Sequence, residues 1–217
     1  YLIKNAKGKY FVFAAVDDLW EPNFLEENVK ILESDEKIVG SIGNVEYFGH
    51  TGNPPKSSKW NLRLKKIIRR QDIDVLEKHV LTCKGDYDKK VGEYLRFNQG
   101  SFVYGVFRTN AIQKNTIHNN LPAWDLAFIL NILKFGDLHV IDKVLLHKFV
   151  GGFSSDGIIS EYKRGDIGFF DMFFPIKFCS WCKKNIGFKF LLKNLDWFFV
   201  LGIFNTVSFF KEIKNKL

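Results

Sequence analysis

The sequence contains few methionines, cysteines and prolines. Its 217 residues include one methionine, three cysteines and five prolines. The cysteines (Cys83, Cys179 and Cys182) are too few, and odd in number, for a disulfide framework, which predicts a reducing compartment. The start shows no signal-peptide pattern. Because the only methionine is Met172, we expect an N-terminus that was processed or that belongs to a longer chain.

Long apolar runs are also missing. The longest stretch without a charged residue, 197–210, has fourteen residues, whereas a membrane-spanning helix needs about 20. Apolar residues nevertheless make up 46% of the chain and aromatic residues 16%, including 23 phenylalanines, which excludes disorder as the global state. A chain of this size suits one α/β domain with an appendage.

Acidic residues are scarce near the C-terminus. Residues 175–217 carry eight lysines against only Asp196 and Glu212, so most of the net charge of +8 comes from the last fifth of the chain. A basic segment rich in Phe and Trp favours a membrane surface or a polyanion as its partner. No nucleic-acid-binding motif accompanies the lysines, so we expect no nucleic-acid partner.

Apolar runs and turn residues predict strands that alternate with helices, which is the pattern of an α/β fold. Short apolar runs bounded by polar or glycine-containing segments predict four strands, at 10–16, 38–48, 101–108 and 138–150. Helical periodicity predicts a helix that opens at Pro22 and another over 122–135. The first strand, the first helix and the second strand are expected to form a right-handed βαβ unit.

Beyond Asp156 the composition shifts to Phe, Lys and Trp, which predicts a domain boundary there. Apolar residues recur at helical spacing over 188–199, with Lys189, Lys193 and Asn194 opposite them. Residues 157–217 are therefore predicted to form an amphipathic helical extension that is basic and rich in aromatic residues. Two partners stay open for it: a membrane surface on which the helix lies flat, and a protein surface on which it packs.

Asp17 and Asp18 directly follow the first predicted strand. Two neighbouring carboxylates repel each other, so the pair is costly unless a cation or hydrogen-bond donors compensate. A hard divalent ion such as Mg2+ or Mn2+ takes oxygen ligands of this kind, and open α/β sheets bind ligands at the carboxyl ends of their strands. The alternative is that Asp18 caps the helix that begins near Pro22, and spacing alone favours the two equally.

Around these residues the sequence resembles family 2 glycosyltransferases of the GT-A fold. The resemblance begins in three stretches: Ala-Lys-Gly-Lys-Tyr-Phe (6–11), Val-Asp-Asp-Leu-Trp-Glu-Pro (16–22) and Phe-Leu-Glu (24–26). In that family the strand ends in an Asp-x-Asp or Asp-Asp signature that holds a metal and the diphosphate of a nucleotide-sugar. The resemblance implies that Asp18 ligates the metal and that Asp17 lies toward the ribose or diphosphate. Ala15 stands where many members have a further Asp.

Two later segments resemble the acceptor side of the same family. Residues 97–108 resemble the segment that lines the acceptor, which implies Asn98 and Gln99 as acceptor-binding residues. The Trp124-Asp125 pair resembles the start of the helix that bears the catalytic acid. This implies Asp125 as the general base and Trp124 as a flat face for the acceptor sugar. From the residues alone, an acid in the first turn favoured by the helix dipole is the stronger interpretation of Asp125, and the resemblance reverses that order.

A last segment, residues 147–154, resembles the Gly-Gly-x-Ser ending of relatives that build surface polysaccharides. It implies that His147, Gly151 and Gly152 lie near the donor diphosphate. From the residues alone, a single His that ends a strand is more often structural, and tight turns use the same glycines.

The resemblance covers about residues 1–156 and implies a metal-dependent, inverting, hexosyltransferase-like enzyme with a partial GT-A, Rossmann-like mixed sheet flanked by helices. It would move a sugar from a nucleotide-diphosphate donor to a saccharide or lipid-linked acceptor in polysaccharide biosynthesis, in the cytoplasm or peripherally at the cytoplasmic membrane face. In the family a nucleotide-binding unit precedes residue 6, so we expect the C-terminal part of a larger transferase. The alternative is a degenerate, non-catalytic module that binds polysaccharide or a membrane surface.

Overall fold

The computed structural model describes residues 2–48, 82–97, 100–115, 121, 123–149, 158–163, 165 and 167–214. The chain divides into two compact units. The first consists of residues 1–116 and 125–150, and the second of residues 117–124 and 151–217. The boundary predicted near residue 156 lies outside the described residues and stays a prediction.

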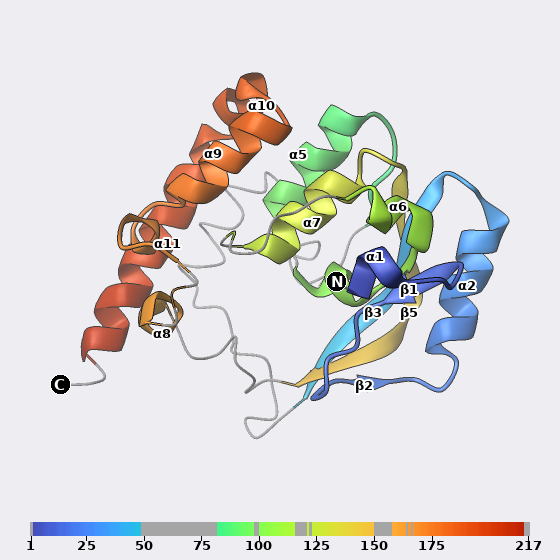
Figure 1. The fold of residues 1–217 in the computed structure, drawn as a ribbon. Coiled ribbons are helices and arrows are strands. Elements are labelled where there is room, and N and C mark those ends of the chain that lie inside the picture. The colour runs from blue at the N-terminus through green and yellow to red at the C-terminus, as the bar shows by residue number, and fades with distance from the viewer. Residues whose placement is uncertain are drawn as a thin grey trace. The chain divides into compact units, whose positions relative to one another are not determined.

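The first unit is built on a five-stranded mixed sheet with the strand order β1-β4-β3-β5-β2 (Figure 1). The strands are Tyr10–Val12 (β1), Leu19–Trp20 (β2), Ile38–Phe48 (β3), Val106–Arg108 (β4) and Asp137–Phe149 (β5). The long strands β3 and β5 are parallel, whereas the other neighbours are antiparallel. The predicted α/β class with a mixed sheet flanked by helices is therefore confirmed.

Helices α2 (Phe24–Ser34) and α7 (Trp124–Ile132) lie on opposite faces of this sheet (Figure 1). Two successive residues of β4 show the arrangement, because successive side chains of a strand point to opposite faces. The ring of Phe107 packs edge-on against Phe128 of α7, with centroids 5.5 Å apart, while the side chain of Arg108 reaches the end of α2. Strand β3 lies between the two layers, and its first six residues are all buried.

Shorter elements complete the first unit. They are α1 (Leu2–Asn5), α5 (Tyr87–Phe97), the 3-10 helix η1 (Gly100–Tyr104) and α6 (Thr109–Gln113). The strand predicted over 101–108 is therefore wrong in its first half, which is η1, and correct over β4.

The first predicted strand, 10–16, ends early, at Val12. Its partner strand sets this limit, because Val12 lies opposite Val106, the first residue of β4, and the 3-10 helix η1 precedes that residue. In addition, β1 and β3 are not neighbours, because β4 lies between them. The expected βαβ unit is thus present only as a crossover that skips one strand.

The second unit is helical. Its elements are α8 (Ile158–Lys163), η3 (Phe170–Met172), α9 (Ile176–Asn185), α10 (Phe188–Lys193) and α11 (Leu195–Lys214). At its centre the buried Phe178 packs against the rings of Trp197 and Phe198, with centroids 6.3 and 6.1 Å away. No helix in the described part of the chain combines the length and the hydrophobicity needed to cross a membrane.

The predicted amphipathic helix over 188–199 is two helices, because Asn194 interrupts it. Asn194 was expected on a polar face with the lysines, yet its side chain is buried. Its Nδ2 donates a hydrogen bond to the carbonyl oxygen of Phe190 at 2.8 Å, and α11 begins at the next residue. An amide that satisfies a main-chain carbonyl in this way competes with the helical hydrogen-bond pattern.

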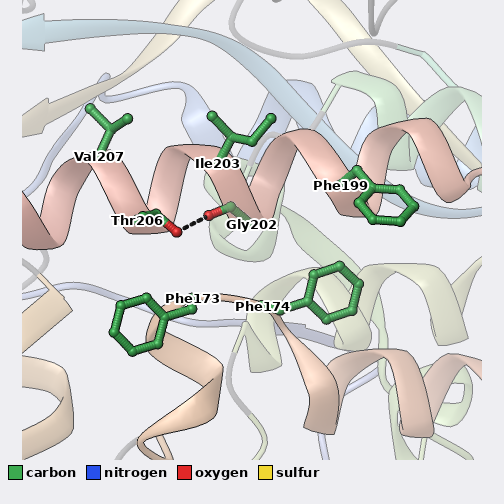
Figure 2. Close-up of a pocket in the computed structure, with 7 residues that line it drawn as sticks. All are labelled: Phe173, Phe174, Phe199, Gly202, Ile203, Thr206 and Val207. Carbon is green, nitrogen blue, oxygen red and sulfur yellow. Dashed lines mark hydrogen bonds between the residues drawn. The ribbon is translucent and has the colours of Figure 1, made fainter.

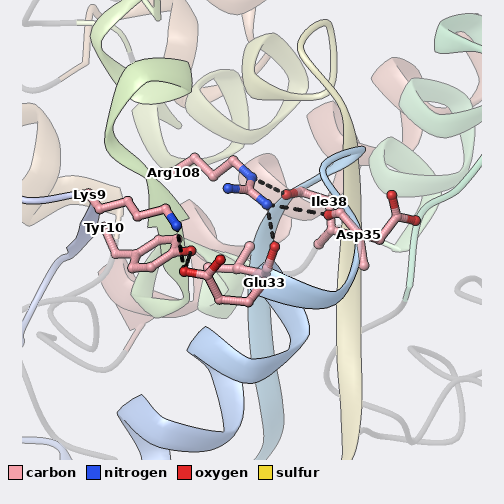
Figure 3. Close-up of polar contacts among 7 residues, drawn as sticks. Lys9, Tyr10, Glu33, Asp35, Ile38 and Arg108 are labelled. Carbon is pink, nitrogen blue, oxygen red and sulfur yellow. Dashed lines mark hydrogen bonds and ion pairs between the residues drawn. The ribbon is translucent and has the colours of Figure 1, made fainter.

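Arg108 ties three elements of the first unit together (Figure 3). Its guanidinium donates hydrogen bonds to the carbonyl oxygens of Leu32 and Asp35 at the end of α2, and to that of Ile38 at the start of β3. The last carbonyl groups of a helix have no partner within the helix, and a cation is favourable there. The same figure shows Lys9 and Tyr10 donating to one carboxylate oxygen of Glu33, both at 2.6 Å.

Replacing Arg108 by methionine should lower the free energy of unfolding by about 2 kcal/mol, because part-buried carbonyl groups lose their donor. Urea denaturation followed by circular dichroism measures this change. Lys9→Met is the control: the Lys9 side chain is 63% exposed, and exposed ion pairs contribute little, so its midpoint should match the wild type. Equal midpoints for both variants would show that Arg108 does not secure α2.

Candidate active site

The carboxylate of Asp18 is fixed at the sheet edge where β3 and β5 end. Asp18 directly precedes β2, and β2 pairs antiparallel with the last part of β5 through Leu19 and His147. Oδ1 of Asp18 accepts a hydrogen bond from the backbone N–H of Phe149, the last residue of β5, at 3.0 Å. The carboxyl ends of parallel strands form the edge at which open α/β sheets bind ligands.

The other carboxylate oxygen of Asp18, Oδ2, is buried and has no hydrogen-bond partner among the described residues. Burial raises the pKa of Asp18, and the charge of Asp17 adds to this, while the Phe149 N–H and the charge of Lys148 lower it. A buried acceptor without a donor is costly. Its environment therefore favours a bound proton or a cation.

Asp17 and Asp18 fit a hard divalent ion, although they do not make a complete site. The orphaned Oδ2 of Asp18 is an oxygen donor of the type that Mg2+ and Mn2+ prefer, and Asp17 is exposed beside it. Among the described residues no group of three His, Cys, Asp or Glu side chains is arranged to hold a metal. An ion at Asp18 would thus need further oxygen ligands from a substrate and water, as Mg2+ commonly does.

Tyr104 lies near both Asp18 and Asp125, and the sequence alone did not single it out. Burial raises the pKa of its half-buried phenol, and the charges of Asp18, Asp125 and Asp17 raise it further. All three carboxylates therefore lie within electrostatic reach of one neutral hydroxyl group. Asp18 and Asp125, which are far apart in the sequence, share one region of the first unit.

Lys148 is a second residue that the sequence alone did not single out. Its Nζ lies 4.9 Å from the centroid of the Tyr104 ring, and its charge lowers the pKa of Asp18. An ammonium over an aromatic face is held by the ring's negative surface. Both residues fall inside segments that resemble the glycosyltransferases, but no residue pattern distinguished them from their neighbours.

Asp125 stands in the first turn of α7. Its Oδ1 accepts the backbone N–H of Leu126 at 2.8 Å, which fits the helix-terminus interpretation. Its Oδ2 lies against Gly100, where any Cβ would overlap that oxygen. The charge of Asp125 also adds to the raised pKa of the buried Tyr94. One oxygen of the carboxylate is thus oriented by the main chain, and the other faces a residue that has no side chain.

The remaining predicted site residues divide into two groups. His147 is held between two glutamates, with Nε2 2.7 Å from Oε1 of Glu21 and Nδ1 3.4 Å from Oε2 of Glu46. Trp124 begins α7 and is 48% exposed. The others lie outside the described residues, and they are Asn98, Gln99, Gly151 and Gly152.

A family model matches the first part of the chain. Residues 1–87 match the sequence model of the family described as Glycosyl transferase family 2. No curated protein matches the chain. The predicted resemblance is therefore confirmed over a segment that includes Asp17 and Asp18 and ends before Tyr104, Asp125 and Lys148. The mixed sheet is consistent with part of a GT-A fold, and the match supports glycosyl transfer as the general activity.

Asp18→Asn should raise the thermal unfolding midpoint at about pH 7, because ionised Asp18 is unfavourable in the folded state. The sign follows from the raised pKa of Asp18 in the folded protein. In the unfolded protein Asp18 loses its proton near the ordinary pKa of 3.8, whereas in the folded protein it loses that proton only at a higher pH. Stability falls across that interval, so the advantage of the variant should vanish as pH drops below 3.8.

Differential scanning fluorimetry at a series of pH values measures this difference. Asp17→Asn is the control, since it removes the same charge from an exposed neighbour, and its midpoint should change less. A less stable Asp18→Asn protein at neutral pH would mean that the carboxylate is a structural group.

Proposed function

We propose that this chain, whose residues 1–87 match family 2 glycosyltransferases, forms the acceptor-activating and diphosphate-binding side of a metal-dependent, inverting glycosyltransferase. One observation carries the proposal: Asp18, from the family segment, is fixed at the carboxyl edge of the sheet with a buried oxygen that has no hydrogen-bond partner among the described residues. Donor and acceptor chemistry must meet at one carbon atom, so the groups that serve them must share one region. The family implies a nucleotide-sugar donor and an acceptor.

Asp125 is proposed as the general base. Oδ2 of Asp125 takes the proton of the acceptor hydroxyl while the acceptor oxygen forms a bond to the anomeric carbon. The bond from that carbon to the nucleotide diphosphate breaks on the opposite face, which inverts the configuration. The Leu126 N–H fixes the rotation of the carboxylate through Oδ1, and Oδ2 lies close to Gly100, where any Cβ would overlap that oxygen. Trp124 offers its half-exposed ring to the acceptor sugar.

Asp18, with Asp17 beside it, is proposed to hold Mn2+ or Mg2+. When bound, such an ion neutralises the negative charge that develops on the leaving diphosphate. The ammonium group of Lys148 lies over the ring of Tyr104 and near Asp18, and it is proposed to stabilise the same negative charge on the leaving diphosphate. The raised pKa of Tyr104 keeps its phenol protonated, so that it can donate a hydrogen bond to a substrate oxygen.

The further donor and acceptor contacts stay proposals from the resemblance. His147 is proposed near the diphosphate, and its two glutamate partners hold its ring at the end of β5. Gly151 and Gly152 are proposed near the diphosphate, and Asn98 and Gln99 near the acceptor. A reducing, cytoplasmic setting for polysaccharide assembly is proposed from the small, odd number of cysteines.

The competing candidate is a non-catalytic module that binds polysaccharide. It is favoured by Ala15, which replaces a carboxylate that many relatives carry, and by the interpretation of Asp125 as a first-turn acid. Both candidates predict saccharide binding, so only turnover separates them.

Asp125→Asn in the full-length protein should reduce kcat by about 10²- to 10⁴-fold with little change in donor binding, because the amide cannot accept the proton. Release of nucleoside diphosphate from a panel of nucleotide-sugars in the presence of Mn2+ measures the rate. Asp142→Asn is the control, since Asp142 is an exposed carboxylate in the middle of β5 that accepts a hydrogen bond from Asn44. No turnover with any donor would favour the non-catalytic module, whereas equal rates for Asp125→Asn and the wild type would show that Asp125 is not the general base.

Lys148→Met should raise the donor KM by about tenfold or more, because a charge-assisted contact to phosphate contributes roughly 1.5–3 kcal/mol. Steady-state kinetics with varied donor concentration gives this value. Lys143→Met is the matched control on the same strand: Lys143 is exposed and pairs with Glu27 at 2.8 Å, so its loss should leave the donor KM unchanged. If the two variants have the same donor KM, Lys148 does not contact the donor.

A further inference from the structure

Helix α11 of the second unit is apolar on two opposite sides. Trp197, Phe198 and Gly202 are buried within the unit. On the other side four apolar residues recur at steps of four, four and three, and they are between 45% and 61% exposed: Phe199, Ile203, Val207 and Phe210. We call these four residues the outer face of α11. A continuous apolar stripe that remains exposed marks an interaction surface.

A groove opens beside the outer face (Figure 2). It has a volume of about 290 Å³ and is lined by Phe173, Phe174, Phe199, Gly202, Ile203, Thr206 and Val207. Thr206 is the only polar side chain of this lining, and its hydroxyl already donates to the carbonyl oxygen of Gly202 at 2.8 Å. Because the lining side chains offer no spare polar group, the groove suits a hydrocarbon chain.

Gly202 makes the groove possible. The carbonyl oxygen of Phe173 lies 2.9 Å from the place that a Cβ of residue 202 would occupy, and Phe174 is nearly as close. The chain between η3 and α9 therefore approaches the backbone of α11 directly. As Figure 2 shows, the rings of Phe173 and Phe174 face α11 across the groove.

Positive charge lies at the C-terminal end of this apolar surface. Lys211 and Lys214 are exposed at the end of α11, and Lys214 lies one step of four beyond Phe210, so it continues the outer face. The described helices of the second unit carry further exposed lysines, namely Lys177, Lys183, Lys184, Lys189 and Lys193. Of the acidic residues on α11, Asp196 stands at its start. Glu212 accepts hydrogen bonds from the backbone N–H groups of Ile158 and Ile159, so its carboxylate is already paired within the unit.

We propose that the outer face of α11 and its groove dock on an anionic lipid bilayer, with the helix parallel to the membrane surface. Phe199, Ile203, Val207 and Phe210 enter the boundary between headgroups and acyl chains, one acyl chain occupies the groove, and Lys211 and Lys214 contact lipid phosphates. The excess of lysine over acid selects an anionic bilayer over a neutral one. The charge-free stretch of α11, fourteen residues long, lies on the bilayer because about 20 are needed to span it.

Co-sedimentation of the full-length protein with large vesicles tests the proposal, using phosphatidylcholine alone and with about 30% phosphatidylglycerol. The wild type should bind the anionic vesicles about tenfold more tightly than the neutral ones. The double variant Ile203→Gln/Phe210→Gln should lose at least about tenfold in affinity for both, because two apolar side chains no longer insert. Lys211→Gln/Lys214→Gln should weaken binding to the anionic vesicles only.

Ser208→Gln is the matched control, because Ser208 is exposed on the same helix but lies outside the outer face, and its binding should equal that of the wild type. Circular dichroism checks that each variant retains its helices. Three outcomes would overturn the proposal: no binding of the wild type to the anionic vesicles, equal binding of all variants, or a wild-type dimer in analytical ultracentrifugation that Ile203→Gln/Phe210→Gln dissociates. The last outcome would assign the face to a second copy of the chain. If Ile203→Gln/Phe210→Gln fails to fold, Lys211→Gln/Lys214→Gln still tests the proposal.

Discussion

The hydrogen bond from the backbone N–H of Phe149 to Oδ1 of Asp18 determines where the candidate site lies. It forms because β2, only two residues long, pairs with the end of β5, while β5 follows β3 in parallel along almost its whole length. Main-chain pairing therefore places Asp18 at the carboxyl edge of the sheet, independently of flexible side chains. The same end of β5 carries Lys148, which covers Tyr104, so a single strand terminus positions both the acid and its neighbouring cation.

The surroundings of Asp18 at this edge of the sheet destabilise the folded protein. Oδ2 of Asp18 is buried without a hydrogen-bond partner among the described residues, and Asp17 adds a like charge beside it. Folded proteins rarely retain an unsatisfied buried acceptor unless a ligand or a function compensates. Asp18 is the only carboxylate among the buried side chains that lack a partner for a polar atom in the described part of the chain, and the others are Asn28, Ser41, Thr109 and His139. Burying an acid without a donor is costlier than burying a neutral polar group, which supports a binding role for Asp18.

The sequence predicted the parts that depend on local pattern. The 38–48 strand was correct at both ends, and the 138–150 strand was shifted by one residue, since both are apolar runs between clear turn signals. Asp17, Asp18 and Asp125 could be proposed from residue type and order. Tyr104 and Lys148 could not, because their proximity to these acids arises from the β2–β5 pairing and the fold of η1. The early end of β1 and the break at Asn194 escaped prediction for a similar reason: they depend on the short partner strand β4 and on a buried side-chain amide.

A crystal structure of the full-length protein with Mn2+ and a nucleoside diphosphate tests the central claim most directly, with anomalous scattering used to locate the ion. The account predicts a manganese ion within about 2.0–2.4 Å of Oδ2 of Asp18, in a cleft that Asp125 also faces. An ion bound elsewhere with Oδ2 still buried and unpartnered, or Asp125 turned away from the diphosphate, would contradict it.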